Sequence, residues 1–351
     1  MFSHSIILLW VVMIAPMAAI IPAVFLQEGG RFCKLNKKLA DRFRFLAVIR
    51  KFFLERDFID VLTPPLVSCP VIEPHIHPFR VSSSQRLDQG SDFYLHTSPE
   101  FWMKSLLSEG FENIFTLSYC FRDGPPSPIH RPQFLMLEWY RAHESYHQIA
   151  CDLEELTRAL LGSFGRNDLI AVEKMSVAEI FRCHLGIDIL ELSCKESLGD
   201  YIKNHHPDIP LPKIALSWED YYHLLFLNKI SPLLRRYPFL ILDEYPAELR
   251  ALSRLKPCDP RVCERFEYFV HGVEVANCYG ELTHLEEQKK CFQEFDKVRT
   301  QVGQERMPEP ALLYRALEKG IPPSAGIALG VERFMGVLLD REEIFLTEES
   351  S

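Results

Sequence analysis

Apolar residues recur with two different periods along this chain. Over residues 39–57 the period is three to four, which predicts an amphipathic helix. Its apolar face would carry Leu39, Phe43, Leu46, Ile49 and Phe53. The same period predicts a helix over 149–164, whereas the alternation in 115–121 is typical of a half-buried strand. Residues 134–140 form a second apolar run, so 123–133 would be the loop of a long hairpin.

The C-terminal part of the chain repeats this mixture of strands and helices. Residues 264–283 predict two strands joined by a turn at His271-Gly272, and 324–339 predict a strand that runs into a helix. The sequence contains neither a G-x-G-x-x-G motif nor a P-loop motif, so no Rossmann or P-loop nucleotide site is expected. Hairpins mixed with separate helices predict the α+β class, with helices packed on an antiparallel sheet.

The first 30 residues differ from the rest. Residues 6–26 contain no charged side chain and as a helix would span roughly 31 Å, enough to cross a bilayer. Lys and Arg follow this run and none precedes it, so the positive-inside tendency places the body of the protein in the cytoplasm, tethered to the membrane. A second interpretation is a start codon assigned too far upstream, because Met13 and Met17 lie inside the run. The body is expected to be cytoplasmic in both cases.

The net charge argues against one class of partner. The 351 residues include 39 Lys and Arg against 48 Asp and Glu, a formal charge of −9. Proteins that wrap a long stretch of nucleic acid usually present a basic surface, so extended binding of tRNA or DNA is disfavoured. The ten cysteines are scattered without a C-x-x-C pair, which fits buried thiols in a reducing compartment better than a structural zinc site.

Three groups of polar residues contain the parts of a magnesium–ATP site. They are Arg122 with His130 and Arg131, Glu274 with Asn277 and Glu281, and Gly330 with Arg333. Guanidinium groups bind phosphate oxygens, and one or two carboxylates hold a hard cation. Each residue alone also has an ordinary explanation, such as an ion-paired Arg at the end of a strand. Their order along the chain favours a site.

Several segments resemble the class II aminoacyl-tRNA synthetases. "FRDGPPSPIHRPQFLMLEWY" (121–140) is similar to their motif 2, "GIALGVERF" (326–334) to motif 3, and "FIDVLTPPLV" (58–67) to the end of motif 1. "GVEVANCYGELT" (272–283) resembles the segment before motif 3 in the lysyl type. "TSPE" and "MLEWY" also occur in a paralogous family, the ligases that attach (R)-β-lysine to elongation factor P. The resemblance implies a class II catalytic domain over 33–345, with an antiparallel sheet flanked by helices.

The resemblance also implies ATP and Mg²⁺ as cofactors and assigns roles to residues. Arg122 and Arg333 would be catalytic, Arg122 on the α-phosphate and Arg333 over the adenine and on the γ-phosphate. Phe134 would stack on the adenine, and Glu274 and Glu281 would hold magnesium. The other ATP-binding positions are Asp123, Gly124, His130, Arg131, Glu274, Val275 and Gly330. The amino-acid substrate positions are Ser98, Pro99, Glu100, Tyr140, Asn277 and Glu281, with Glu100 facing a substrate ammonium.

Two of these positions have a local structural expectation as well. Ser98 would be the N-cap of a helix whose first residue is Pro99, with Glu100 in its first turn.

The chain departs from the family pattern in places. Gly124 stands where the family has Glu, and Arg131 and Gln133 stand where it has Asn and Glu. Losing a carboxylate contact would weaken nucleotide binding by about 1–3 kcal/mol. Lysyl-tRNA synthetases carry an anticodon-reading β-barrel before motif 1, and residues 1–38 are too few for one. No anticodon-binding domain is therefore expected, and tRNA is disfavoured as the acceptor.

Three functions stay open at this point. The first is an ATP-dependent ligase that activates a lysine-like amino acid as an adenylate and transfers it to a lysine of elongation factor P. The second is a stand-alone lysyl-type synthetase domain that loads tRNA or another acceptor, and the third is a non-catalytic paralogue. The motif 1 segment, which ends at Pro64, implies a homodimer in each case.

Overall fold

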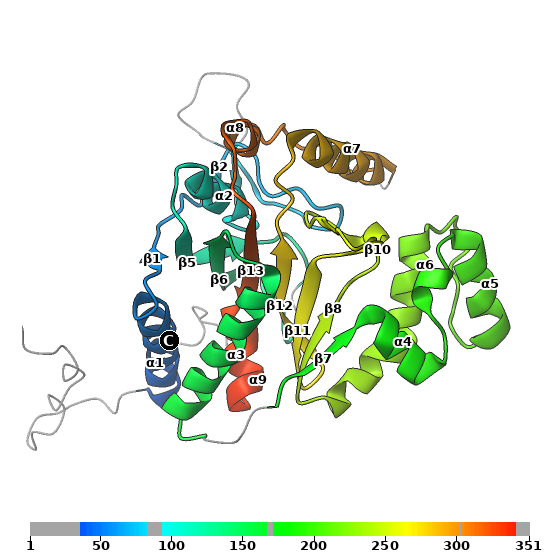
Figure 1. Ribbon diagram of the computed structural model, residues 1–351, viewed down its shortest axis with the longest axis horizontal. Helices are drawn as coiled ribbons and strands as arrows, with labels where there is room; N and C mark the ends of the chain where they lie inside the picture. Colours follow the sequence, from blue (N-terminus) through cyan, green and yellow to red (C-terminus); the bar gives the residue numbers. More distant parts are fainter. Residues whose placement is uncertain (1–35, 83–92, 126, 167–170, 302, 342–351) are drawn as a thin grey trace, which may run out of the picture. The chain divides into compact units, whose positions relative to one another are not determined.

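The computed structural model describes residues 36–82, 93–125, 127–166, 171–301 and 303–341 (Figure 1). Met1–Asp41 form one unit, of which 36–41 are described, and Arg42–Ser351 form the unit that holds the sheet and the site. The expected apolar segment 1–30 lies outside the described residues. Within the described ranges, no helix combines the length and apolar character needed to cross a membrane.

An eight-stranded sheet forms the centre of the second unit and confirms the predicted α+β class. Its order is β1 (Ile59–Asp60), β5 (Asn113–Phe121), β6 (Gln133–Ala142), β13 (Ser324–Gly330), β12 (Val273–Gly280), β11 (Arg265–Val270), β8 (Phe239–Asp243) and β7 (Glu173–Ser176). All inner pairs are antiparallel, and only the pairs β1–β5 and β7–β8 at the two edges are parallel. The long hairpin predicted around 123–133 is β5–β6.

Apolar helix faces cover one side of this sheet. The helices are α1 (Lys37–Leu54), α3 (Tyr146–Ser163) and α9 (Val331–Leu339), and Figure 1 shows α3 and α9 lying across the strands. They bury Phe45, Ile49, Leu153 and Phe334 together with Trp139 of β6. The predicted helices 39–57 and 149–164 are confirmed with shifted ends. The first ends at Leu54 because the chain turns at Asp57, whose φ is 59°.

The other side of the sheet carries a second apolar cluster and leaves room for a cavity. Here lie α2 (Glu100–Ser108), α7 (Leu285–Gln301), α8 (Ala311–Lys319) and a small sheet of β2 (Leu66–Val67), β4 (Phe93–Leu95) and β3 (Arg80–Val81). The predicted turn at His271-Gly272 joins β11 to β12, and both residues have positive φ, 50° and 79°. Gly272 also packs on the backbone of Arg235, where a side chain would collide.

Residues 177–236 form a helical region beside β7 and β8. It contains α4 (Val177–Leu185), α5 (Lys195–His205), α6 (Trp218–Leu225), a π-helical turn (Phe226–Ile230) and two 3₁₀ turns (Ile189–Glu191 and Ser231–Arg236). A third 3₁₀ turn (Ala247–Leu249) and a hairpin of β9 (Leu255–Lys256) and β10 (Asp259–Cys263) lead back to the sheet. This region has its own apolar cluster, which includes Leu240 and Leu242 of β8 and so joins it to the edge of the sheet.

Candidate active site

A cavity of about 550 Å³ opens on the sheet face opposite α3 and α9. Its lining includes fourteen of the sixteen predicted site residues: Ser98, Glu100, Arg122, Gly124, His130, Arg131, Phe134, Tyr140, Glu274, Val275, Asn277, Glu281, Gly330 and Arg333. Asp123 and Pro99 do not line it. Asp123 instead uses its backbone N–H to bind the carbonyl of His77 at 2.7 Å, and Pro99 precedes α2. The individual roles of the fourteen stay predictions.

Strand alternation places the β6 residues of the site. Phe134, Met136, Glu138 and Tyr140 point to the cavity, whereas Leu135, Leu137 and Trp139 point to the helices. Successive side chains of a strand face opposite sides of a sheet, so one run of residues builds both the core and the site. Glu138 was not among the predicted site residues, although this alternation would have identified it.

A β-bulge brings the β12 residues onto one face. Tyr268 pairs with Ala276 and Phe269 pairs with Glu274, so Val275 is an extra residue on β12. The extra residue reverses the alternation. Glu274 therefore lies on the same cavity face as Asn277 and Glu281, although a regular strand would have turned it away.

Gly326 of β13 is the floor of the cavity beneath two of these side chains. A Cβ atom there would collide with the ring of Tyr140 and lie 2.7 Å from Oε1 of Glu281. Glycine is needed at this position because both side chains cross directly over the backbone.

Two carboxylates at one end of the cavity share a buried lysine. Lys104 of α2, which is 1% exposed, places its Nζ 2.6 Å from Glu100 and 2.7 Å from Glu281. Burial alone would lower the pKa of Lys104, but the two carboxylates raise it above its usual value. Burial raises the pKa of Glu281 to about 7, against the opposing effect of Lys104. We call Glu100, Lys104, Glu138 and Glu281 the acidic end.

Glu138 completes the acidic end and is fully buried. Ser98 Oγ donates a hydrogen bond to it at 2.6 Å, and Tyr140 OH donates another at 3.2 Å. Burial raises the pKa of Glu138 to about 8 although both hydrogen bonds act to lower it. The expectation that Ser98 caps a helix starting at Pro99 is wrong by one residue. The helix starts at Glu100, and Ser98 Oγ accepts from the Glu100 N–H at 3.1 Å while its hydroxyl donates to Glu138.

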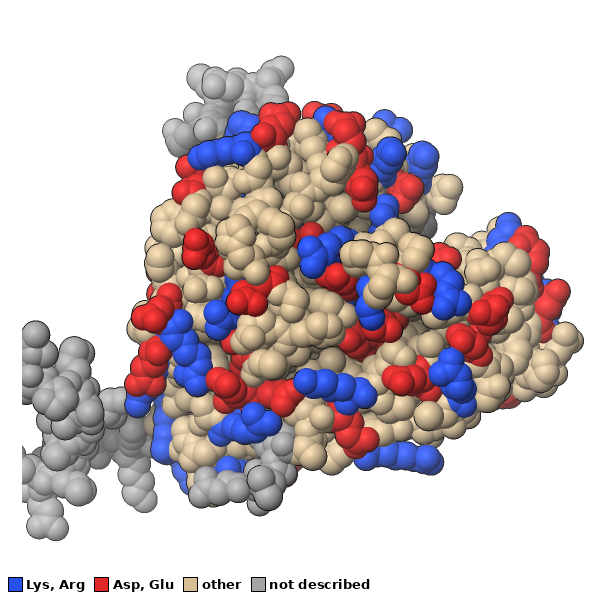
Figure 2. All heavy atoms as spheres, viewed as in Figure 1, with Lys and Arg blue, Asp and Glu red and all other residues tan. Residues whose placement is uncertain are grey.

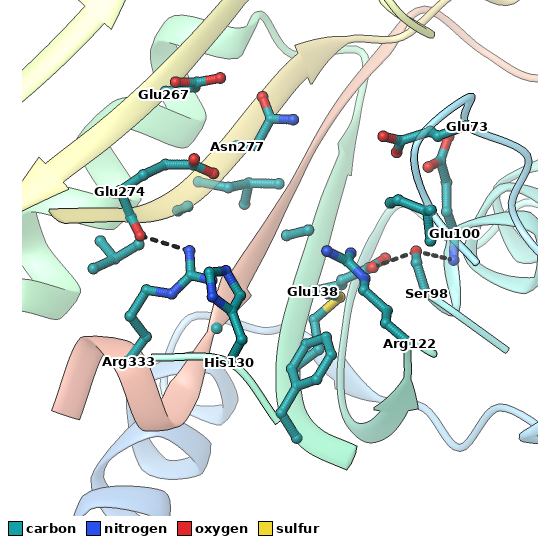
Figure 3. Close-up of a pocket in the computed structure, with 18 of the residues that line it drawn as sticks. Glu73, Ser98, Glu100, Arg122, His130, Glu138, Glu267, Glu274, Asn277 and Arg333 are labelled. Atoms are coloured by element: carbon teal, nitrogen blue, oxygen red, sulfur yellow. Dashed lines mark hydrogen bonds between the residues drawn. The ribbon is translucent and has the colours of Figure 1, made fainter. Parts of the chain in front are cut away.

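Cationic side chains with few bonds to the described residues line the rest of the cavity. Figure 3 shows Arg333 and His130 beside Glu274, whereas Arg122 lies nearer to Ser98 and Glu138. Arg333, in the first turn of α9, donates to the Glu274 carbonyl at 2.8 Å. The Arg122 guanidinium lies 5.3 Å from the ring centre of Phe134, and its Nε donates to Thr97 O at 3.4 Å. His130 lies beside Arg333, and burial followed by the charges of Arg333 and Arg122 lowers its pKa. We call Arg122, His130, Glu274 and Arg333 the cationic end.

Glu274 is the carboxylate of the cationic end that fits a hard cation. Its side chain faces the cavity, and burial raises its pKa to about 7, with Glu267 adding to the rise and Arg333 opposing it. Glu281 has one oxygen on Lys104, which leaves the other for a further ligand. In the described part of the chain there is no group of three or more His, Cys, Asp or Glu that could hold a metal by itself. Mg²⁺ in nucleotide sites commonly uses one or two carboxylates plus phosphate oxygens, which is what these two residues offer.

Comparison with known proteins identifies the relatives of this fold and site. The family model of class II tRNA synthetases (D, K and N) matches residues 29–347. The chain belongs to the class II tRNA synthetase family. Among curated relatives, the elongation factor P–(R)-β-lysine ligase of Vibrio cholerae is 34% identical over 313 residues, 88% of this chain and 93% of the relative. The ligases of that name from Erwinia tasmaniensis and Pseudoalteromonas translucida are each 32% identical and cover 91% and 87% of this chain, and 94% and 92% of their own lengths.

The class II synthetase family membership confirms the predicted resemblance and fold. The predicted set nevertheless omitted three residues that shape the site, namely Glu73, Lys104 and Glu138. Lys104 follows Glu100 by four residues, a spacing that puts both on one side of a helix and was therefore readable. Glu73 lies in the loop that follows the motif 1 segment, and no local signal indicates its position.

Proposed function

We propose that this chain is an ATP-dependent ligase that activates a lysine-like amino acid, (R)-β-lysine, and transfers it to a lysine of elongation factor P. The observation that carries the proposal is the similarity to ligases of that name over about nine-tenths of both chains. The cavity supports it, because it has an acidic end for an amine-bearing substrate and a cationic end for a polyphosphate.

The chemistry would be one adenylyl transfer followed by one acyl transfer. A carboxylate oxygen of the amino acid attacks the α-phosphorus of ATP, and the bond to pyrophosphate breaks with its electron pair leaving on pyrophosphate. Arg122 and Arg333 stabilise the negative charge that develops, and Glu274 and Glu281 would hold Mg²⁺, which screens the phosphates when bound. The acceptor amine then attacks the acyl carbon, loses a proton and displaces AMP. The protein contributes orientation and charge, and no covalent nucleophile is required.

Surface charge supports a protein acceptor over tRNA. On the face shown in Figure 2, Lys and Arg are interspersed with Asp and Glu. The net charge of −9 points the same way. Binding that releases many counterions from a nucleic acid needs a concentration of positive charge.

A homodimer is part of the proposal. Apolar side chains around the motif 1 segment are exposed: Phe43, Leu54, Ile59, Leu62 and Leu66, with Leu62 93% exposed. Large apolar side chains exposed along one stretch of the chain support a protein interface there. Light scattering at micromolar concentration should give twice the chain mass of 40.8 kDa. A monomer mass would contradict the proposed homodimer.

The adenylation step is tested by ATP–pyrophosphate exchange. The wild-type protein should exchange label only when (R)-β-lysine or a close analogue is present. Absence of exchange with every diamino acid tried would favour the non-catalytic alternative and contradict the proposal.

A further inference from the structure

The loop between β2 and β3 carries a carboxylate that lines the cavity. The proposed chemistry assigns no role to it. Glu73 lies in this loop, and its side chain lines the cavity beside Glu100 (Figure 3). Its carboxylate takes part in no ion pair or hydrogen bond with any residue that the structure describes, unlike Glu100 and Glu281, which share Lys104.

The backbone around Glu73 is held from three sides, so its position is a property of the fold. Thr97 Oγ1 donates to the Val71 carbonyl at 3.2 Å. Buried Arg299 of α7 donates to the carbonyls of Glu73 at 3.4 Å and Ile76 at 3.2 Å. The Asp123 N–H bonds the His77 carbonyl at 2.7 Å, which ties the loop to the β5–β6 hairpin.

The charges of the neighbourhood do not balance. Lys104 is the buried cation of the acidic end and pairs with two of its three carboxylates, and Glu73 adds a fourth carboxylate that forms no ion pair with a described side chain. Burial raises the pKa of Glu73, Glu100 adds to the rise, and Arg122 opposes it. A half-buried carboxylate without a cation is costly, and an incoming ammonium group would remove that cost.

We propose that Glu73 is a specificity-determining residue that binds, together with Glu100, the substrate ammonium nearest the reacting carboxylate. This rests on the proposed function, because it takes a diamino acid as substrate. The position of Arg122 assigns Glu73 to the ammonium near the carboxylate. Arg122 lines the same cavity and lies on the side of Glu73 and Glu100 in Figure 3, and it would hold the phosphate that the substrate carboxylate attacks. Glu138 and Tyr140 would then bind the ammonium that is farther from the reacting carboxylate.

Exchange kinetics of Glu73→Gln test the assignment. The KM for the diamino acid should rise roughly ten- to hundred-fold, because a hydrogen bond to a charged group is lost, while the KM for ATP stays within about twofold. Glu73→Asp should recover much of the loss. Glu305→Gln is the matched control, because it removes the same charge from a side chain that is 84% exposed and should behave as wild type.

A substrate analogue locates the ammonium. 6-Aminohexanoic acid keeps the carboxylate and the distant amine but lacks the near one. As a competitive inhibitor it should bind wild type and Glu73→Gln equally, whereas the diamino acid should not. Three results with Glu73→Gln would each overturn the proposal: an equal loss of affinity for 6-aminohexanoic acid and the diamino acid, a parallel rise in the KM for ATP, or an unchanged KM for the diamino acid.

The test remains decisive if the enzyme proposal fails. A wild-type protein that binds the diamino acid by calorimetry without exchanging pyrophosphate removes the proposed function, and the calorimetric comparison with Glu73→Gln still decides the role of Glu73. A wild-type protein that neither exchanges nor binds the diamino acid overturns both.

Discussion

The two ends of the cavity are built in different ways. At the acidic end, Glu100 and Lys104 lie on α2, Glu138 lies on β6 and Glu281 directly follows β12, and each is bonded to a neighbour, with Lys104 between Glu100 and Glu281 and Ser98 on Glu138. At the cationic end, Glu274 and Arg333 lie on β12 and α9, whereas His130 lies on the loop of the β5–β6 hairpin and Arg122 at its base. Among the described residues, Arg122 makes a long hydrogen bond to a carbonyl and a contact with an aromatic ring.

This difference indicates which end selects the amino acid and which end binds the nucleotide. A buried carboxylate cluster held by ion pairs and hydrogen bonds is preorganised and can distinguish substrates by the position of an amine. A set of cationic groups that lies partly on a loop adapts to a flexible polyphosphate and contributes charge more than shape. Substitutions at the acidic end should therefore affect both folding and amino-acid binding, whereas those at the cationic end should affect nucleotide binding and chemistry with little effect on folding.

Lys104→Met should have the largest effect on the acidic end. It leaves two buried carboxylates without their cation, so the free energy of unfolding should fall by about 3–5 kcal/mol in urea titrations. Lys289→Met is the control. Among the described residues, Lys289 pairs with exposed Glu286 and lies 5.6 Å from the ring centre of Tyr314, so the loss should stay within about 1 kcal/mol. A loss below about 1 kcal/mol for Lys104→Met would mean that the acidic end is not held together by this ion-pair network.

Arg122→Ala should reduce catalysis while leaving the stability of the fold almost unchanged. The transition-state barrier for adenylate formation should rise by about 2.7–4 kcal/mol, a loss of two to three orders of magnitude in pyrophosphate exchange, with the melting temperature almost unchanged. Arg158→Ala, which breaks an exposed pair with Glu154, serves as the control. Exchange within tenfold of wild type would show that Arg122 does not act on the phosphate.

The pH dependence of amino-acid binding tests the role of Glu138 at the acidic end. The pKa of Glu138 is about 8, so below pH 8 this carboxyl is mostly protonated and must lose its proton to pair with an ammonium. The KM for the amino acid should therefore rise as pH falls, by up to about tenfold per pH unit for one proton. Exchange assays between pH 6 and 8.5 measure this, and Glu138→Gln should flatten the profile. A flat wild-type profile would contradict the assignment.

Gly124→Glu tests the smallest expected effect, at the cationic end. Gly124 has no positive φ and no atom within 4 Å of an added Cβ, so a side chain fits without strain. Restoring the family's carboxylate should tighten ATP binding by about 1–2 kcal/mol, roughly five- to thirty-fold, in calorimetry. Unchanged affinity at equal melting temperature would indicate that Arg131 has replaced the missing contact.

Local patterns predicted the elements better than the site. The β5–β6 hairpin, the turn at His271-Gly272 and the helix over 149–164 follow from alternation, turn chemistry and helical period, and all three are confirmed. The ends of the helices were shifted, because a tertiary turn such as the one at Asp57 ends a helix before its apolar pattern does.

The site required information that no single segment contains. The order of polar residues along the chain grouped Glu274 with Asn277 and Glu281, but the physical reason is a bulge at Val275 that sequence spacing does not indicate. Glu73 lines the cavity from a loop that Arg299, more than two hundred residues away, helps to hold. Long-range contacts of this kind are what local periodicity cannot supply.

The central claim is that this chain activates a lysine-like amino acid and loads it onto a protein. The most direct test is the intact mass of elongation factor P after incubation with the enzyme, ATP, Mg²⁺ and (R)-β-lysine. The account predicts a gain of one lysyl residue that requires ATP, maps to a single lysine and is absent with Arg122→Ala. An unmodified mass, under conditions where wild-type protein exchanges pyrophosphate with the same amino acid, would contradict the account and point to a different acceptor.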